Sequence, residues 1–175
     1  MFKLLPFAVL FILNFSSNDP YLAKINKDDR TIKEKLEKIA VENLRSWEPP
    51  FHEEKMLEPF DRSDALSVVI DGFLIKGYKQ WKKIVYESMK SDRDSKFKKY
   101  RHIIKEMRTS VLSQNSGAVT VIYTWDYITQ DNMHYNNNAA VTLVFKLEGN
   151  EWKIIQFHVS HGKKELISEN TEKPN

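Results

Sequence analysis

The sequence contains no cysteine, and among its 175 residues it has only five glycines and six prolines. The absence of cysteine excludes disulfide bonds, thiol nucleophiles, thiolate metal sites and lipid-modified cysteines. The sequence also has no long run of residues of one charge, because its 27 basic residues are interleaved with 24 acidic ones. Nucleic acid is therefore not an expected partner. What is present is 41% hydrophobic residues, enough for the core of one globular domain.

The amino-terminal stretch has a short apolar run, Leu4 to Phe15, between Lys3 and a polar Ser-Ser-Asn-Asp segment. This run has the length of a signal-peptide hydrophobic region and is too short to span a bilayer. We therefore expect residues 1–19 to be a signal peptide and the protein to be exported, either periplasmic or secreted. We expect no transmembrane segment beyond this region. Export without disulfides is more typical of a bacterial envelope than of small cystine-rich modules.

Two amphipathic helices are predicted in the first half of the chain. Apolar residues recur at steps of three and four from Thr31, where "TIKE" forms a capping box, until Pro49 and Pro50 end the helix. The second helix begins at Tyr78, after Gly77. Between them, the sequence predicts a short helix at 53–57 and a hairpin whose turn is Asp71-Gly72.

After Phe97 the period of the apolar residues changes to two, which predicts four long strands at 97–113, 117–129, 137–149 and 151–161. The predicted turns are 114–117, 131–138 and 149–150. Helices followed by an antiparallel run of strands indicate an α+β domain with the helices on one face of the sheet. Residues 163–175 are read as a polar carboxy-terminal tail.

The segments "GNEWKIIQFHVSHG" and "IDGFLIKGYKQW" carry a resemblance to a known family. Residues 29–162 resemble the nuclear transport factor 2 superfamily, especially SnoaL-like domains and the association domain of calcium/calmodulin-dependent protein kinase II. The resemblance implies a cone: a curved antiparallel sheet wrapped around N-terminal helices, with a pocket at its wide end. It also implies a possible homodimer through the outer face of the sheet. Members of the superfamily differ in function, so the resemblance does not indicate which function this chain has.

Strand alternation divides the candidate site residues. On the last strand, Ile155, Phe157, Val159 and His161 share the face expected to line the pocket. The opposite, outward face is expected to carry Trp152, Ile154, Gln156, His158 and Ser160, and His158 is a candidate interface residue. Aromatic residues of the 117–129 strand and the second helix are expected to join the first set. The candidate pocket residues are Tyr78, Trp81, Tyr123, Trp125, Tyr127, Leu143, Phe145, Phe157, Val159 and His161. They favour a small hydrophobic or aromatic ligand, although the same rings could simply fill the core.

Candidates for chemistry are few. Ser160 lacks a nucleophile turn, so a serine–histidine triad is excluded. Asp71 is a weak candidate base, alone or with His102 as in scytalone-dehydratase-like members of the family, because a turn aspartate is expected to be solvated. Asp126 lies on the outer face by alternation. The "FHEE" segment (51–54) does not make a metal site by itself, and neither a metal nor another cofactor is expected.

The preferred functional hypothesis is an exported domain that binds a small hydrophobic or aromatic ligand or acts as a dimeric interaction module. The alternative is an enzyme similar to ketosteroid isomerases, polyketide cyclases or dehydratases, which uses general acid–base catalysis in the cone pocket. A cavity with a buried histidine or carboxylate beside a tyrosine would favour the enzyme. A cavity filled by its own Tyr and Trp rings would favour the interaction module.

Overall fold

The computed structural model describes residues 20–89 and 96–169. Its elements follow the chain in this order: α1 (Pro20–Ser46), α2 (Glu53–Leu57), β1 (Ser67–Ile70), β2 (Phe73–Lys76), α3 (Tyr78–Met89), β3 (Phe97–Ser113), β4 (Ser116–Thr129), β5 (Met133–Glu148) and β6 (Glu151–Glu169). The expected signal peptide lies outside the described residues. Within these residues, no helix combines the length and the apolar character that a membrane span needs.

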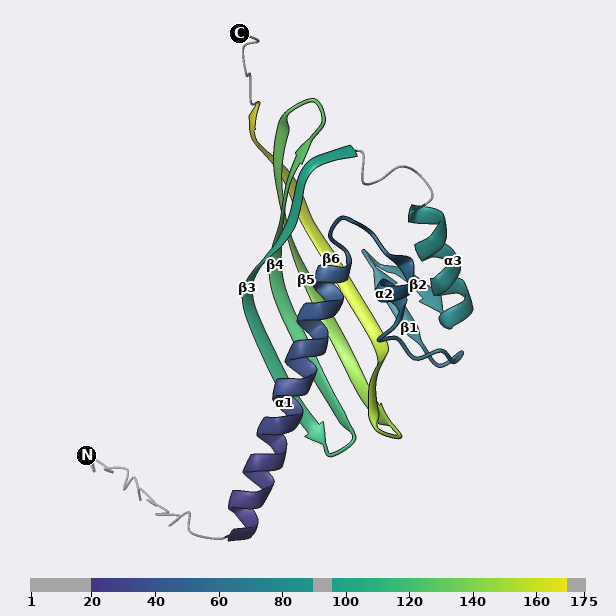
Figure 1. Cartoon of the computed structure of the whole chain (residues 1–175), viewed down its shortest axis with the longest axis vertical. Helices are drawn as coiled ribbons and strands as arrows, with labels where there is room; N and C mark the ends of the chain where they lie inside the picture. Colours follow the sequence, from purple (N-terminus) through teal and green to yellow (C-terminus); the bar gives the residue numbers. More distant parts are fainter. Residues whose placement is uncertain (1–19, 90–95, 170–175) are drawn as a thin grey trace, which may run out of the picture.

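The six strands form one curved sheet in the order β2-β1-β6-β5-β4-β3 (Figure 1). The α+β prediction is confirmed, but the sheet is mixed rather than wholly antiparallel, because β1 pairs with β6 in parallel. The connector before β1 explains this direction. Phe60 forms a parallel bridge with Ile154, and the Asp61 N–H donates to the Ile154 carbonyl at 2.9 Å, so the chain already runs alongside β6 when β1 begins.

Helix α1 crosses one face of the sheet, while α2, α3 and the β1–β2 hairpin lie beside β6 (Figure 1). The helix begins at Pro20, eleven residues before the predicted start, so the expected capping box at Thr31 is inside the helix. Proline is favoured in the first helical turn, and no glycine or proline interrupts the residues from 21 to 30. The predicted end before Pro49 and Pro50 is confirmed.

Strands β5 and β6 are longer than predicted. The segment 131–138 was expected to be a turn, but β5 already begins at Met133, and its first residues pair with β6 as far as Glu169. The expected tail from Lys163 is therefore strand up to Glu169. Its polar side chains do not prevent pairing, since main-chain hydrogen bonds need no particular side chain.

Three register shifts interrupt the pairing of β6 with β5, and the two that flank residues 156–161 change which residues point inward. One lies opposite Val144 and Phe145, so Trp152 and Ile154 are buried, at 8% and 0% exposure, whereas strict alternation placed them outside together with His158. The other lies at Gly162, where an added Cβ would be 2.9 Å from the Asn138 carbonyl oxygen. Between the bulges the predicted alternation holds, and Phe157 and Val159 are buried while His158 is exposed.

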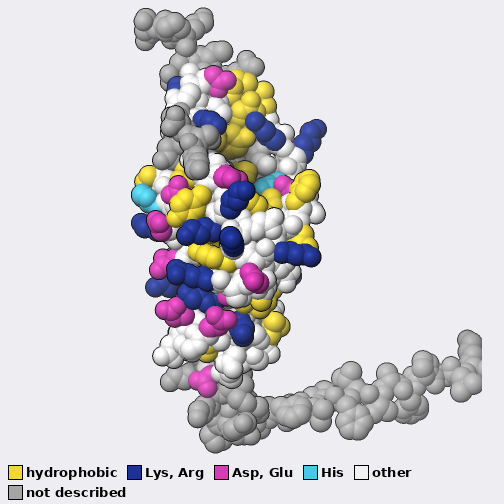
Figure 2. All heavy atoms as spheres, turned by 90° about the vertical axis from the view of Figure 1, so that its right-hand side faces the viewer, with side chains coloured by type: hydrophobic (Ala, Val, Ile, Leu, Met, Phe, Trp, Pro, Cys, Tyr) yellow, Lys and Arg dark blue, Asp and Glu magenta, His cyan; other side chains and the backbone are white. Residues whose placement is uncertain are grey.

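The core lies between α1, the smaller helices and the concave face of the sheet. Side chains buried to 1% exposure or less come from every layer: Leu36, Ala40, Met56, Phe60, Leu66, Val68, Trp81, Val85, Val119, Val121, Leu143, Phe145 and Ile154. Contact between α1 and β4 is so close that a Cβ at Gly117 would lie 2.4 Å from Leu36 Cδ1. On the outside, Figure 2 shows acidic and basic side chains interleaved over the visible face, as they are in the sequence.

Candidate active site

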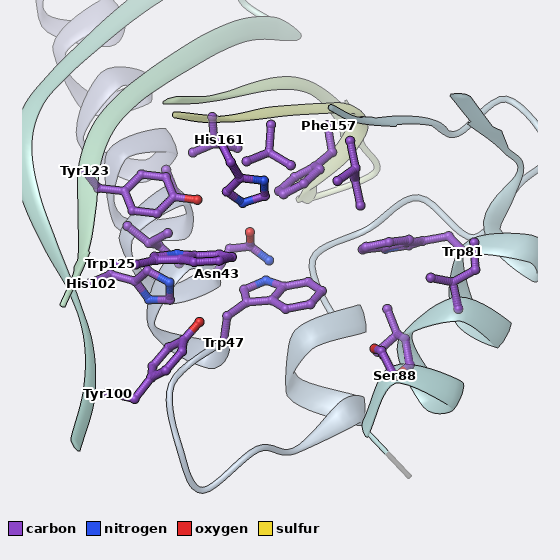
Figure 3. A pocket seen from close by; sticks show the side chains of 17 residues that line it. Asn43, Trp47, Trp81, Ser88, Tyr100, His102, Tyr123, Trp125, Phe157 and His161 are labelled. Carbon is purple, nitrogen blue, oxygen red and sulfur yellow. The ribbon is translucent and has the colours of Figure 1, made fainter. Parts of the chain in front are cut away.

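A cavity of about 210 Å³ opens between the helices and the concave face of the sheet (Figure 3). Its wall is mainly apolar and aromatic, and the residues come from elements far apart in the sequence. They are Ala40, Asn43, Leu44 and Trp47 around α1; Ile70 of β1; Trp81, Ile84, Val85 and Ser88 of α3; Tyr100 and His102 of β3; Tyr123 and Trp125 of β4; Val141 of β5; and Phe157, Val159 and His161 of β6. A wall of this kind suits a small, mostly apolar molecule.

Tryptophan rings and one amide form the side of the cavity nearest the helices. The rings of Trp47 and Trp81 have centroids 5.7 Å apart, and Trp81 stacks on Phe157 at 6.1 Å. Within the described part of the chain, Nε1 of both tryptophans and Nδ2 of the buried Asn43 have no hydrogen-bond partner. Buried donors are normally satisfied, so these three N–H groups are available to acceptor atoms of a ligand.

His102 enters the cavity from β3, and its side chain is only 2% exposed. Glu48, just after α1, holds this residue in two ways. Its Oε1 accepts the His102 backbone N–H at 2.7 Å and lies 3.4 Å from the imidazole Nδ1. The Glu48 carboxylate is thus a negatively charged neighbour of the imidazole on its Nδ1 side.

Aromatic rings surround His102. Its ring centroid lies 5.2 Å from Tyr123, 5.3 Å from Tyr100 and 5.8 Å from Trp125. Burial raises the pKa of the Tyr123 hydroxyl, so this phenol stays protonated and can donate a hydrogen bond. The site thus places a histidine and a carboxylate beside a phenol in apolar surroundings.

His161 lies on β6 at the rim of the cavity, with its ring centroid 4.5 Å from that of Trp125. Both carboxylate oxygens of Asp71 bind it. Oδ1 accepts the His161 backbone N–H at 2.8 Å, and Oδ2 is 2.8 Å from Nδ1. The hydrogen bonds from His161 lower the pKa of Asp71, more than its slight burial raises it. Asp71 is exposed to solvent, as the sequence suggested, with 46% of its side chain accessible, but its carboxylate also binds His161 because the β1–β2 turn lies against β6.

Six of the ten candidate pocket residues line this cavity: Trp81, Tyr123, Trp125, Phe157, Val159 and His161. The other four lie elsewhere. Leu143 and Phe145 are core residues at 1% and 0% exposure, Tyr78 is packed against the core at the start of α3, and Tyr127 stacks on Tyr135 at 5.4 Å. His158 is exposed, with Nε2 3.5 Å from Ser160 Oγ. Its candidate role at an interface stays a prediction.

The sequence reasoning missed several residues of the cavity. Trp47 was predicted only as part of the apolar face of the first helix, and no role was predicted for Asn43 or Glu48. Tyr100 was not considered, although it alternates with His102 on a predicted strand. That alternation was the available signal, because Tyr100 and His102 lie opposite Tyr127 and Trp125 in the sheet. His102 was paired with Asp71, but its carboxylate partner is Glu48.

A third histidine–carboxylate cluster, around Asp126, lies outside the cavity. Asp126 is 4% exposed although it points away from the concave face. His134 Nε2 lies 2.6 Å from its Oδ1, and Arg101 Nε and Lys99 Nζ lie 2.7 Å and 3.7 Å from its Oδ2. In the described residues, no group of three or more histidine, aspartate or glutamate side chains is arranged to hold a metal ion.

Comparison with solved structures gives the same architecture at low sequence identity. A hexachlorocyclohexane dehydrochlorinase, LinA-type3 from Novosphingobium barchaimii LL02, matches with a TM-score of 0.66 and 10% identity, over 86% of this chain and 99% of that one. An NTF2-like protein of unknown function from Pseudomonas putida KT2440 matches with a TM-score of 0.57 and 9% identity, over 75% and 87%. An NTF2-like protein of unknown function from Shewanella oneidensis MR-1 matches with a TM-score of 0.53 and 17% identity, over 73% of this chain and 97% of that one.

Neither a family model nor a curated protein matches the sequence. The structural matches nevertheless cover the helices and the curved sheet, and they agree with the resemblance seen in the two sequence segments. The chain has the nuclear transport factor 2-like fold.

Proposed function

We propose that the protein is an acid–base catalyst that removes a proton from a carbon atom of a small, largely apolar substrate. The observation that carries this proposal is His102, whose buried imidazole lines an apolar cavity with the Glu48 carboxylate 3.4 Å from Nδ1. Histidine exchanges protons near neutral pH, and a carboxylate on one ring nitrogen directs the other nitrogen to the substrate. In this scheme His102 is the base and Glu48 its positioning residue.

Tyr123 supports the proposal because removal of a proton next to a carbonyl places negative charge on oxygen. A protonated phenol in an apolar cavity can stabilise such charge by a hydrogen bond. The raised pKa of Tyr123 keeps the phenol in the required form. The N–H groups of Asn43 and Trp47 are further donors in the same wall.

The fold comparison adds support of a general kind. The match from Novosphingobium barchaimii is a dehydrochlorinase, and dehydrochlorination is an elimination in which a carbon atom loses a proton. An identity of 10% carries no substrate to this chain. It does indicate that a cavity of this fold can accommodate the chemistry proposed here.

The test uses 5-nitrobenzisoxazole, a small planar molecule from which a base removes the C3 proton while the N–O bond breaks and a coloured cyanonitrophenolate forms. The phenolate is a good leaving group and needs no acid, so the reaction measures only the base. We expect His102→Gln to lower kcat/KM by about 100-fold or more. His158→Gln, a change of the same kind on the exposed face of β6, should leave it unaltered. Equal rates for wild type and His102→Gln would refute the proposal.

The second candidate function is binding without catalysis, which the sequence alone had favoured. The indole rings of Trp47, Trp81 and Trp125 in one apolar wall support it. The two candidates separate in one experiment. A binder quenches or shifts tryptophan fluorescence on addition of 5-nitrobenzisoxazole but converts it no faster than free imidazole does. Export through residues 1–19 and dimerisation through the outer face of the sheet remain proposals beside either function.

A further inference from the structure

We infer that Asn43, Trp47 and Trp81 form a subsite for a hydrogen-bond acceptor, and that the ligand is a small neutral carbonyl compound such as a ketone, an ester or a lactone. We call these three residues the donor subsite. The inference deepens the proposed function and rests on it in one respect, that the cavity is the place where the ligand binds. It does not depend on the role of His102.

Asn43 is a polar residue where the pattern of α1 calls for an apolar one. It lines the cavity together with Ala40, Leu44 and Trp47, and these four residues have the i, i+3, i+4, i+7 spacing of one apolar stripe. Asn43 is only 4% exposed. A buried amide that lacks a hydrogen-bond partner destabilises the fold, whereas leucine, which has the same branching and number of side-chain heavy atoms, does not. The amide is therefore expected to serve binding rather than stability.

Two tryptophans extend this group of donors. Trp47 follows Asn43 by four residues and continues the last turn of α1, since its backbone N–H donates to the Leu44 carbonyl at 3.3 Å, so both side chains lie on the same side of the turn. Trp81 comes from α3, and its ring centroid is 5.7 Å from that of Trp47. Figure 3 shows the Asn43 amide directed into the ring of lining side chains, above the Trp47 indole.

The three side chains share an unmet need for an acceptor. Nδ2 of Asn43 and Nε1 of Trp47 and Trp81 are buried, and none of them has a hydrogen-bond partner in the part of the chain that the structure describes. A buried indole N–H normally finds a partner. Three such donors, contributed to one wall by two separate elements, point to an acceptor that the ligand supplies.

The charge of the wall limits this acceptor to a neutral group. Among the described residues that line the cavity there is no lysine, arginine, aspartate or glutamate, and the titratable side chains are Tyr100, His102, Tyr123 and His161. His161 is already paired with the Asp71 carboxylate. A bound carboxylate would therefore lose its hydration without gaining a cation of its own. A neutral carbonyl oxygen loses less and offers two lone pairs to the N–H groups.

A hydroxyl group suits the donor subsite less well than a carbonyl group. Its oxygen can accept a hydrogen bond, but its hydrogen needs an acceptor in turn. All the unpartnered buried atoms that the donor subsite contributes are donors. A bound alcohol would thus bury an O–H group without a partner, and we expect the site to discriminate against it.

The shape of this side of the cavity favours a flat molecule. The planes of Trp81 and Phe157 are inclined by 29°, with centroids 6.1 Å apart, and the Trp47 ring is inclined by 35° to that of Trp81. Flat aromatic walls pack well against a planar ring. The cavity of about 210 Å³ therefore suits a small ring compound that carries its carbonyl group directly on the ring.

The test compares three molecules with the same rigid skeleton: 1-indanone has a carbonyl group, 1-indanol has a hydroxyl group at the same carbon, and indane has neither. Isothermal titration calorimetry gives the Kd of each. We expect wild type to bind 1-indanone about three- to tenfold more tightly than 1-indanol, which corresponds to about one hydrogen bond. Asn43→Leu should weaken the binding of 1-indanone by a similar factor without weakening that of indane. His158→Gln, on the exposed face of β6, should leave all three Kd values unchanged.

A second readout needs no ligand. Because Nδ2 of Asn43 is buried without a partner, Asn43→Leu should raise the melting temperature by about 2–6 °C. A fall would show that the amide is bonded within the protein, and it would overturn the inference. Trp47→Phe keeps a ring and removes only the N–H side of the indole, and it should weaken the binding of 1-indanone by about threefold.

Each binding result decides. Equal affinity of wild type for 1-indanone and 1-indanol would overturn the inference, and so would failure to bind any of the three molecules. Equal losses for 1-indanone and indane in Asn43→Leu would also overturn it, because the residue would then act through its shape. The proposed function fails separately, if His102→Gln converts 5-nitrobenzisoxazole at the wild-type rate, and that result would leave the donor subsite standing.

Discussion

Removal of the Asp126 carboxylate should destabilise the protein by an amount that can be worked out from its contacts. The side chain is 6% exposed, and it is bound by Arg101 at 2.7 Å and His134 at 2.6 Å, with Lys99 at 3.7 Å. These residues belong to β3, β4 and β5, so one carboxylate joins three neighbouring strands. Hydrogen bonds to charged groups contribute about 1.5–3 kcal/mol each.

The exposure of the partners sets the magnitude. Breaking a fully buried pair costs about 3–5 kcal/mol, because an uncompensated charge is left inside. Here Arg101 and Lys99 are 51% and 47% exposed, so water can hydrate both after the carboxylate is removed. We therefore expect Asp126→Ala to lower the free energy of unfolding by about 2 kcal/mol. For a chain of this size the melting temperature should fall by about 4–8 °C.

The same carboxylate predicts a dependence on pH. Burial alone would raise the pKa of Asp126, but hydrogen bonds from His134 and Arg101 outweigh it and lower the pKa. A group whose pKa is lower in the folded state stabilises the protein above its unfolded pKa, about 3.9 for aspartate, and loses this effect as the pH falls through the folded value. The difference between wild type and Asp126→Asn should therefore shrink from about pH 5 downward.

Urea denaturation at about pH 7 and about pH 4 measures both effects. The control is Glu34→Gln, which removes a carboxylate that is 69% exposed on α1 and should change stability by less than about 0.5 kcal/mol. A cost for Asp126→Ala below about 0.5 kcal/mol, or a difference that does not vary with pH, would refute the reasoning. Combining Asp126→Asn with Arg101→Gln should give less than the sum of the two single effects.

Three further predictions concern other parts of the molecule. Gly117→Ala should lower the free energy of unfolding by about 1–3 kcal/mol, because the new Cβ would be 2.4 Å from Leu36 Cδ1; a change under about 0.5 kcal/mol in urea would contradict this contact. Burial raises the pKa of Tyr123, so this residue should stay protonated up to about pH 11. The tyrosinate absorbance that appears on titration to about pH 11 should therefore be the same in wild type and in Tyr123→Phe. A smaller increase in the variant would show that Tyr123 ionises normally. Ile122, 39% exposed on the outer face, should tolerate lysine without loss of the fold; if wild type sediments as the expected dimer, Ile122→Lys should sediment as a monomer, and a persistent dimer would place the interface elsewhere.

Local patterns predicted most of the fold. The period-two segment 97–113 coincides with β3, and the Asp71-Gly72 turn forms where two adjacent residues tolerate positive φ. These features depend on neighbours in the sequence. The parallel pairing of β1 with β6 depends on contacts between residues almost ninety positions apart, and no local pattern encodes it.

The candidate site was predictable to the extent that alternation held. Tyr123, Trp125, Phe157 and His161 point into the cavity as expected, because no bulge separates them on their strands. The errors at Trp152 and Ile154 come from a bulge, which shifts the register by one residue without a glycine or proline to mark it. The carboxylate partners were missed for a different reason. Glu48 and Asp71 lie in loops, and only the tertiary fold brings them to His102 and His161.

The parallel pairing of β1 with β6 also determines when, during synthesis of the chain, the sheet and the two histidine–carboxylate pairs can form. Glu48 and His102 are both present once the first two thirds of the chain have been synthesised, whereas Asp71 must wait for a strand that begins at Glu151. A nascent chain that has left the ribosome only up to β5 therefore contains the deep histidine but not the rim histidine. The β1–β2 hairpin, made early, joins the rest of the sheet only through β6, the last strand to be synthesised.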